Sequence, residues 1–163
     1  MCIRGNKNII RVFVAIKKVI RTFVANKKTI RAFVAIKKNM TDIIYKEESY
    51  EIIGKCMEVH NLLGAGFLEI VYKDALEYEF KKAGIPYERE KEYKVNYKGI
   101  ILPHKFYADF VVFDKIILEV KGVSALNEEF IAQCINYLKV STSKLALLVN
   151  FGELRLNYKR IVL

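Results

Sequence analysis

A six-residue run near the middle of the chain, Ile116–Lys121, restricts the possible folds more than any other segment. It is almost continuously apolar until Glu119. Runs of this kind are typical of strands buried on both faces, which occur in sheets that helices cover on two sides. The run therefore predicts a central strand in an α/β protein.

Patterns around this run predict the other elements. Apolar residues spaced three and four apart indicate helices at 49–63 and about 68–82, and Asn127 is expected to cap a helix of about 13 residues. Alternating or apolar runs predict further strands at 87–97, 106–113, 145–149 and 154–163. This order favours a mixed sheet with helices on both sides.

The central strand ends in charged residues. Side chains alternate along a strand, so Glu119 and Lys121 share one face and Val120 lies on the other. Taken alone, such a pair is more simply interpreted as an exposed ion pair near a sheet edge. Asp109 favours a site instead, because it lies in the preceding strand, immediately before the apolar run 110–113, and a hairpin brings it beside Glu119. Two adjacent carboxylates repel each other unless a cation lies between them, and Mg²⁺ or Mn²⁺ suits such ligands.

The length of the hairpin turn tests this site. A turn made only of Asp114 and Lys115 would pair position 109 with position 120 and direct Asp109 away from Glu119. The site therefore requires a bulge or a longer turn.

Residues 1–39 form a basic extension. Three near-identical copies of ten residues begin at Ile10, Ile20 and Ile30, and residues 1–40 contain 11 Lys and Arg with no Asp or Glu. The remainder holds 17 basic and 18 acidic residues, so the net charge of +10 says nothing about the substrate of 40–163. We expect two parts, the extension 1–39 and one domain, 40–163.

The period of ten suits neither a continuous helical stripe, which would rotate by about 80° per copy, nor hairpin strands, since no turn residues separate the copies. A dispensable or read-through extension, with Met40 as the candidate start, is the favoured interpretation. A basic arm that binds membrane surfaces or nucleic acid is the alternative. Organellar targeting is disfavoured because the segment lacks serine.

Cysteine spacing and hydropathy exclude several classes. The three cysteines are scattered and form no Cys-x-x-Cys pair, so a reduced, cytoplasmic setting is expected. Lys or Arg interrupts the apolar N-terminal stretch, so no membrane span is expected. The charges recur throughout that stretch instead of preceding an apolar block, so no signal peptide is expected.

One motif carries a family resemblance. Gly66-Phe-Leu-Glu69-Ile-Val-Tyr72 reproduces a Gly-x-x-Glu-x-x-Tyr signature, and the chain resembles the GxxExxY proteins, which are grouped with the PD-(D/E)XK nuclease superfamily. The resemblance covers essentially all of 40–163 and none of the repeats. It implies a restriction-endonuclease-like core, in which a mixed β-sheet is flanked by helices.

The resemblance also implies a set of site residues. Asp109, Glu119 and Lys121 correspond to the superfamily's metal-binding acid, second acid and lysine, and Ala108 replaces the proline before the aspartate. Gln133-Cys-Ile-Asn-Tyr137 resembles the Gln-x-x-x-Tyr motif of the RecB-like branch, which helps to hold the active site and the nucleic acid. The implied catalytic residues are Lys121, Glu119, Asp109, Glu69, Gln133 and Tyr137. The metal ligands that it implies are Asp109, Glu119, Glu69 and His60, and we add the Val120 carbonyl as a hypothesis.

Several of these residues have a structural interpretation too. Gln133 and Tyr137 lie four apart and could close the core, Glu69 and Tyr72 could form a contact within a helix, and a lone helical histidine such as His60 is often structural. Their combination in this order favours a site.

These expectations lead to a functional hypothesis. The protein is expected to be a Mg²⁺- or Mn²⁺-dependent nuclease that hydrolyses phosphodiester bonds in DNA or RNA, with DNA the favoured partner. The alternative is a catalytically silent nuclease-like protein that binds nucleic acid or acts as a scaffold. A membrane-surface protein driven by the repeats is a third hypothesis, and it predicts liposome binding that is lost when translation starts at Met40.

Overall fold

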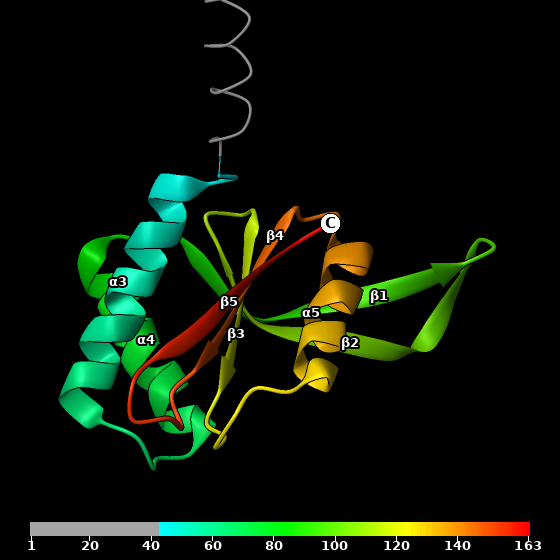
Figure 1. The fold of residues 1–163 in the computed structure, drawn as a ribbon. Coiled ribbons are helices and arrows are strands. Elements are labelled where there is room, and N and C mark those ends of the chain that lie inside the picture. Colours follow the sequence, from blue (N-terminus) through cyan, green and yellow to red (C-terminus); the bar gives the residue numbers. More distant parts are fainter. Residues whose placement is uncertain (1–42) are drawn as a thin grey trace, which may run out of the picture. The chain divides into compact units, whose positions relative to one another are not determined.

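A computed structural model of the chain describes residues 43–163, and its elements follow the expected order (Figure 1). The helices are α3 (Lys46–Leu63), α4 (Glu69–Ala83) and α5 (Glu128–Ser141). The strands are β1 (Tyr87–Tyr97), β2 (Ile100–Val112), β3 (Ile116–Lys121), β4 (Leu145–Asn150) and β5 (Asn157–Val162). The basic repeats lie outside the described residues.

The strands form one mixed sheet in the order β1-β2-β3-β4-β5. The β3–β4 pair is parallel and the other neighbouring pairs are antiparallel. All six residues of β3 are buried, so the prediction of a central strand is confirmed. Helix α5 connects the two parallel strands, as a crossover between parallel neighbours requires.

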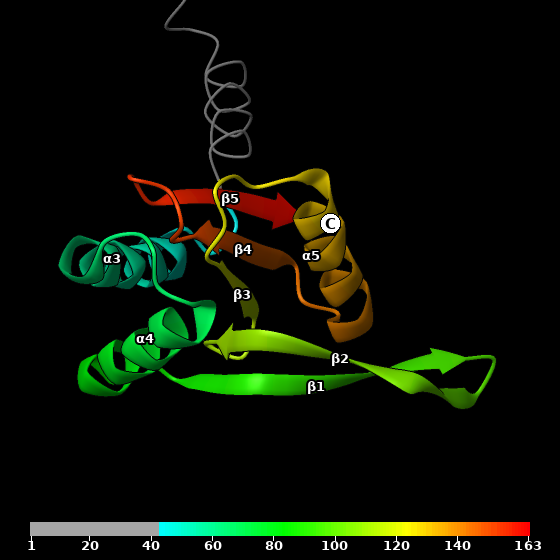
Figure 2. The same cartoon turned by 90° about the horizontal axis from the view of Figure 1, so that it is seen from below.

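Helices cover both faces of the sheet, as predicted (Figure 2). One core lies between the sheet and α3 and α4, and includes Ile52, Phe80 and Leu118. The other lies beneath α5 and includes Ile117 and Leu138. Because successive residues of β3 enter opposite cores, both faces of this strand must be apolar.

Several boundaries differ from the prediction. Helix α3 begins three residues early, after Tyr45, which adopts a left-handed conformation (φ 50°) and makes no side-chain cap. The cap of α5 is confirmed, since the Asn127 side chain accepts a hydrogen bond from the Phe130 amide at 3.1 Å. Strand β5 begins at Asn157 rather than Leu154, which is 95% exposed.

Strand β2 begins six residues before the predicted position. Pro103 argues against a strand there because it has no amide hydrogen to donate. Lys94 pairs with Lys105 and Asn96 with Ile101, so three residues of β2 lie opposite Val95 alone. This bulge accommodates Pro103 where no regular ladder bond is needed.

Within 43–163, no helix is long and apolar enough to cross a membrane.

Candidate active site

The turn between β2 and β3 sets the register of the site. Val112 pairs with Ile116 and Phe110 with Leu118, so the turn contains three residues, 113–115. The turn is therefore one residue longer than a turn of Asp114 and Lys115 alone, as the predicted site requires. Extending this register by one pair sets Asp109 opposite Glu119.

Strand β2 also rotates at Asp109. Ala108 and Phe110 would share a face in a regular strand, yet Phe110 packs beneath α3 and α4 whereas Ala108 packs beneath α5. On β1, Glu90 has a positive φ (53°), and it is skipped between the Arg89 and Lys91 pairs. Asp109 thus lies at the position where the alternation of side chains along β2 is interrupted. Its Oδ2 accepts a hydrogen bond from the Val120 amide at 2.9 Å.

Glu119 and Lys121 form a buried ion pair. Lys121 Nζ donates to Glu119 Oε1 at 2.8 Å and lies 5.2 Å from the centre of the Phe130 ring on α5. The second oxygen, Glu119 Oε2, is buried and has no hydrogen-bond partner among the described residues. Burying such an oxygen without a partner is costly, so it is a strong candidate for binding a cation or a proton.

The electrostatics of the pair follow from burial. Burial first, and then the charge of Asp109, raise the pKa of Glu119 to about 7. Burial works against the Lys121 ammonium group, but the nearby carboxylates outweigh it and the pKa of Lys121 is raised. Lys121 therefore stays positively charged at neutral pH, while Glu119 can exchange a proton or accept a cation.

Helix α4 contributes two groups to this end of the sheet. Glu69, its first residue, accepts a hydrogen bond from the Gly122 amide through Oε1 at 3.1 Å. One turn later, Lys73 Nζ pairs with Asp109 Oδ1 at 3.0 Å, and both side chains are 15% exposed. Lys73 was not predicted as a site residue. Its spacing of four from Glu69 was the available signal, because that spacing places both side chains on one face of a helix.

The signature residues before α4 hold its first turn in place. The Tyr72 hydroxyl donates to the Gly64 carbonyl at 2.8 Å and accepts from the Phe67 amide at 3.1 Å. Gly66 has φ 110°, which favours glycine at that position. The Tyr72 ring stacks on Phe151 at 4.6 Å, so the signature also fastens α4 to the residue that follows β4.

On the face of the sheet that α5 covers, Gln133 and Tyr137 of this helix form a hydrogen bond with each other. Gln133 Nε2 donates to the Tyr137 hydroxyl at 2.9 Å, and that hydroxyl donates to the Tyr107 carbonyl at 2.8 Å. Burial, followed by the charge of Glu119, raises the pKa of Tyr137 to about 12, so the hydroxyl remains a donor. The pair thus bonds α5 to β2 two residues before Asp109.

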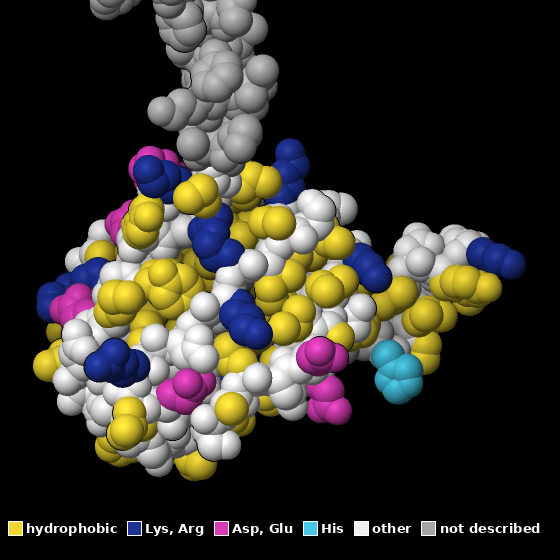
Figure 3. Space-filling view, in the orientation of Figure 1, with side chains coloured by type: hydrophobic (Ala, Val, Ile, Leu, Met, Phe, Trp, Pro, Cys, Tyr) yellow, Lys and Arg dark blue, Asp and Glu magenta, His cyan; other side chains and the backbone are white. Residues whose placement is uncertain are grey.

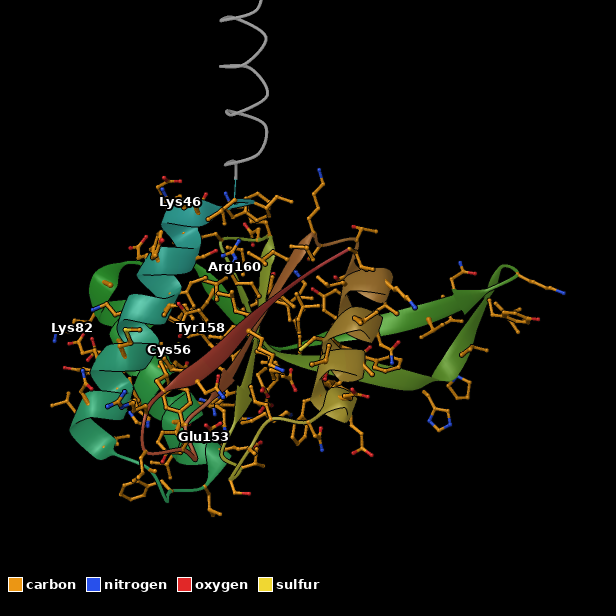
Figure 4. The ribbon with its side chains drawn as sticks, in the orientation of Figure 1. Lys46, Cys56, Lys82, Glu153, Tyr158 and Arg160 are labelled. Atoms are coloured by element: carbon orange, nitrogen blue, oxygen red, sulfur yellow. The ribbon has the colours of Figure 1, made fainter. Side chains whose placement is uncertain are left out.

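His60 makes its contacts elsewhere. Its Nε2 lies 2.9 Å from the Glu153 carbonyl, and its ring lies 6.1 Å from that of Phe151. These contacts fasten the end of α3 to the connection between β4 and β5, where Figure 4 labels Glu153. They match the structural interpretation of His60.

Asn150, at the end of β4, is a positioning residue that the sequence reasoning missed. It is fully buried, accepts from the Val123 amide at 3.0 Å and donates to the Val123 carbonyl at 2.8 Å. The Phe151 amide donates to the Lys121 carbonyl at 2.7 Å. The sequence did contain a signal for Asn150: it is a polar residue at the end of an apolar strand, the pattern that also identified Glu119.

The connections after β3 and β4 also approach each other closely at Gly152. A Cβ on Gly152 would lie 2.3 Å from the Val123 carbonyl oxygen, so this position has no room for a side chain.

The donor set suits a hard divalent cation. Glu119 Oε2 is unsatisfied, Asp109 lies opposite it, and carboxylate and carbonyl oxygens are the ligands that Mg²⁺ and Mn²⁺ prefer. Between residues 43 and 163, no three His, Cys, Asp or Glu side chains form a ready-made ligand group. A shell completed by a backbone carbonyl and water is common for Mg²⁺ and fits these residues.

The chain was compared with curated proteins, solved structures and protein-family models. No curated protein matches the chain. A crystal structure of a protein named SSO0001 aligns with a TM-score of 0.47 and 21% identity, over 56% of this chain and 48% of that one, so this chain spans about half its length. The family model described as PD-(D/E)XK nuclease superfamily matches residues 46–161. That match covers most of the chain and every helix and strand described above except the last residue of β5, and the chain therefore belongs to the PD-(D/E)XK nuclease superfamily.

Proposed function

We propose that residues 40–163 are a Mg²⁺- or Mn²⁺-dependent nuclease that hydrolyses phosphodiester bonds in nucleic acid, with DNA as the first substrate to test. The observation that carries the proposal is the unsatisfied, buried Glu119 Oε2 on the strand opposite Asp109, with Lys121 beside it. A purely structural ion pair would satisfy both carboxylate oxygens, as buried polar groups normally are.

Asp109, Glu119 and the Val120 carbonyl would hold the cation, and Glu69 would complete the shell directly or through water. When bound, a divalent cation lowers the pKa of an attacking water and neutralises charge on the phosphate. Lys73 already places a positive charge on Asp109. In the cation-free protein it therefore offsets part of the repulsion between the two acids.

Lys121 is the residue we assign to the reacting phosphate. Glu119 and the Phe130 ring hold its ammonium group in one place, and its raised pKa keeps it charged. A fixed cation in a buried site orients the attacking water or stabilises negative charge that develops on the phosphate oxygens. Gln133 and Tyr137 act by holding β2 against α5.

Replacing Lys121 with Ala tests the assignment. Cleavage of labelled single-stranded, duplex and branched DNA and RNA in Mg²⁺ or Mn²⁺ should fall by about 100-fold or more. Exposed Lys144, at the opposite end of the parallel strand pair, supplies the matched control, and Lys144→Ala should cleave normally. Lys121→Met retains the apolar stem, and its melting curve shows whether the fold is intact. Normal cleavage by a folded Lys121 variant would refute the assignment.

The catalytically silent alternative is favoured by one observation: residues 43–163 contain 17 Lys and Arg against 17 Asp and Glu, so total charge supplies no attraction to phosphate. A metal titration separates the cases. A hundredfold excess of Mn²⁺ over its Kd should stabilise the wild type by about 2.7 kcal/mol, and Asp109→Ala should remove this effect. Stabilisation by Mn²⁺ without cleavage would favour the silent alternative, and no stabilisation would argue against a metal site.

Within the superfamily, we assign the chain to the GxxExxY proteins of the RecB-like branch. The assignment is supported by the distinct contacts of Glu69 and Tyr72 in the signature and by the Gln133–Tyr137 pair. A reducing, cytoplasmic setting fits Cys56 and Cys134, which are free and buried. Burial raises the pKa of both thiols, so neither suits a reactive role.

A further inference from the structure

The β1–β2 hairpin extends beyond the body of the domain. Its distal part, residues 93–107, is called the arm below. It projects past α5 in two perpendicular views (Figures 1 and 2). From Asn96 to Ile101 every residue is exposed. Because the exposed residues of the arm do not pack in the core, core packing does not explain which side chains they carry.

The arm is basic, whereas the rest of the domain is not. Residues 93–107 contain three Lys, one His and no Asp or Glu. The other residues of 43–163 hold 14 Lys and Arg against 17 Asp and Glu. The positive charge that a phosphate-binding surface needs, and that the domain total lacks, is therefore concentrated here.

Two of these lysines lie directly opposite each other on the two strands. Lys94 pairs with Lys105 in the antiparallel register, and like charges in such a pair are destabilising. Glu92 is the carboxylate they share, at 3.8 Å and 2.8 Å. Lys98, at the tip, lies 5.4 Å from the centre of the Tyr97 ring. An external polyanion would relieve this excess of positive charge.

Exposed apolar and aromatic side chains accompany the lysines. Tyr97, Ile100, Ile101 and Tyr107 are each between 51% and 61% exposed. Figure 3 shows hydrophobic side chains beside Lys or Arg near the tip. Basic side chains interleaved with aromatic ones are the composition with which proteins bind single strands, since the lysines contact phosphates and the rings stack on unpaired bases.

The arm also begins at the candidate site. Tyr107 lies two residues before Asp109, and its carbonyl accepts the bond from Tyr137. With a rise of about 3.3 Å per residue, the strand from Tyr107 to Ile100 covers about 23 Å. A nucleic-acid strand that enters the site can thus continue along this surface for several nucleotides.

We infer that the arm binds the single-stranded segment of the nucleic acid that flanks the bond to be cleaved. This inference deepens the proposed function and rests on it for the position of the cleaved bond. Lys94, Lys98 and Lys105 contact phosphates, and Tyr97 stacks on a base.

The test measures binding of fluorescein-labelled single-stranded DNA by the full chain in EDTA, where no cleavage occurs, across a range of salt concentrations. The triple variant Lys94→Gln/Lys98→Gln/Lys105→Gln should lower the slope of log K against log salt by about 2, since each lost phosphate contact removes about 0.7. Tyr97→Ala should weaken binding by about fivefold or more. Lys139→Gln/Lys144→Gln/Lys159→Gln removes the same charge from exposed lysines elsewhere and should bind like the wild type.

The basic extension is present in every variant, so differences between variants report on the arm. Equal slopes for the arm triple variant and the control would overturn the inference. A dimer in sedimentation experiments that Ile100→Ser/Ile101→Ser disrupts, with DNA binding unchanged, would also overturn it by showing that a second copy occupies the arm.

The experiments distinguish a failure of the nuclease proposal from a failure of the arm proposal. Lys121→Ala tests the nuclease proposal through the loss of cleavage in Mg²⁺ or Mn²⁺, whereas the arm triple variant tests the arm through the salt dependence of binding in EDTA. If the wild type cleaves nothing but the arm triple variant still loses binding, the nuclease proposal fails and the arm stands as a nucleic-acid-binding surface.

Discussion

At the scale of single residues, the acids and the lysine could be identified from the sequence because their types are unusual where they occur. A buried apolar strand that ends in Glu119 and Lys121 requires partners for its charges. Lys73 and Asn150 were not predicted, although each carried a signal: a spacing of four from Glu69 for Lys73, and a polar residue at the end of an apolar strand for Asn150. Only their contacts with Asp109 and Val123 give them a part in the site.

The raised pKa of Glu119 predicts a dependence of stability on pH. In the cation-free protein the pKa is about 7, against an ordinary value of 4.5. Between these pH values the folded state holds a proton that the unfolded state has lost. The contribution of Glu119 to the free energy of unfolding therefore decreases as pH rises from about 4.5 to about 7 and is level above that range. Glu119→Gln imitates the protonated form and should reduce this decrease.

Melting curves in EDTA between pH 4 and pH 9 measure the effect. Glu51→Gln, on the exposed face of α3, is the matched control and should follow the wild type. If Glu119→Gln and the wild type lose the same amount of stability over this pH range, the Glu119 carboxyl group does not cause the pH dependence.

At the scale of elements, the connections that follow β3 and β4 fix the geometry of the site. Asn150 and Phe151 bond to the residues immediately after β3, and Gly152 lets the two connections approach. The end of β3 is therefore held from outside its own strand, which a site of fixed geometry requires.

Gly152→Ala should separate these connections. Its Cβ would meet backbone atoms of Val123 at 2.3 Å and 2.6 Å, so either the connection moves or the variant unfolds. We expect destabilisation by about 1–3 kcal/mol in urea unfolding, together with reduced cleavage because Lys121 moves. Gly54 lies in α3, and a Cβ there would meet no atom within 4 Å outside the neighbouring helix backbone. Gly54→Ala should therefore be neutral or stabilising by up to about 1 kcal/mol. Equal stability of the two variants would show that the connection adapts freely.

Element types could be predicted because apolar periodicity reports burial directly. Strand β1 and the cap of α5 depended on local signals, and both were predicted correctly. The start of β2 was wrong because the bulge around Pro103 depends on its partner strand, which the local pattern does not contain. The site required the three-residue turn and the rotation of β2 at Asp109, and both arise from pairing across the sheet.

At the scale of the whole molecule, net charge is a poor guide to function. The +10 total comes from residues 1–40, whereas 43–163 are balanced. Charge within the domain is nevertheless uneven, with a basic arm on an otherwise acidic body. The distribution of charge over the fold, and not its sum, therefore determines where a polyanion can bind.

The parallel pairing of β3 with β4 has a consequence for the newly made chain. Asp109 and Glu119 are synthesised before α5, β4 and Asn150. Until β4 has been made, β3 therefore lacks its parallel neighbour, and Val123 lacks its hydrogen bonds with Asn150. Pairings between distant segments close late in folding. We therefore expect the candidate site to be incomplete on the ribosome until β4 and Asn150 have emerged, so that the proposed nuclease would be inactive while it lies close to messenger and ribosomal RNA.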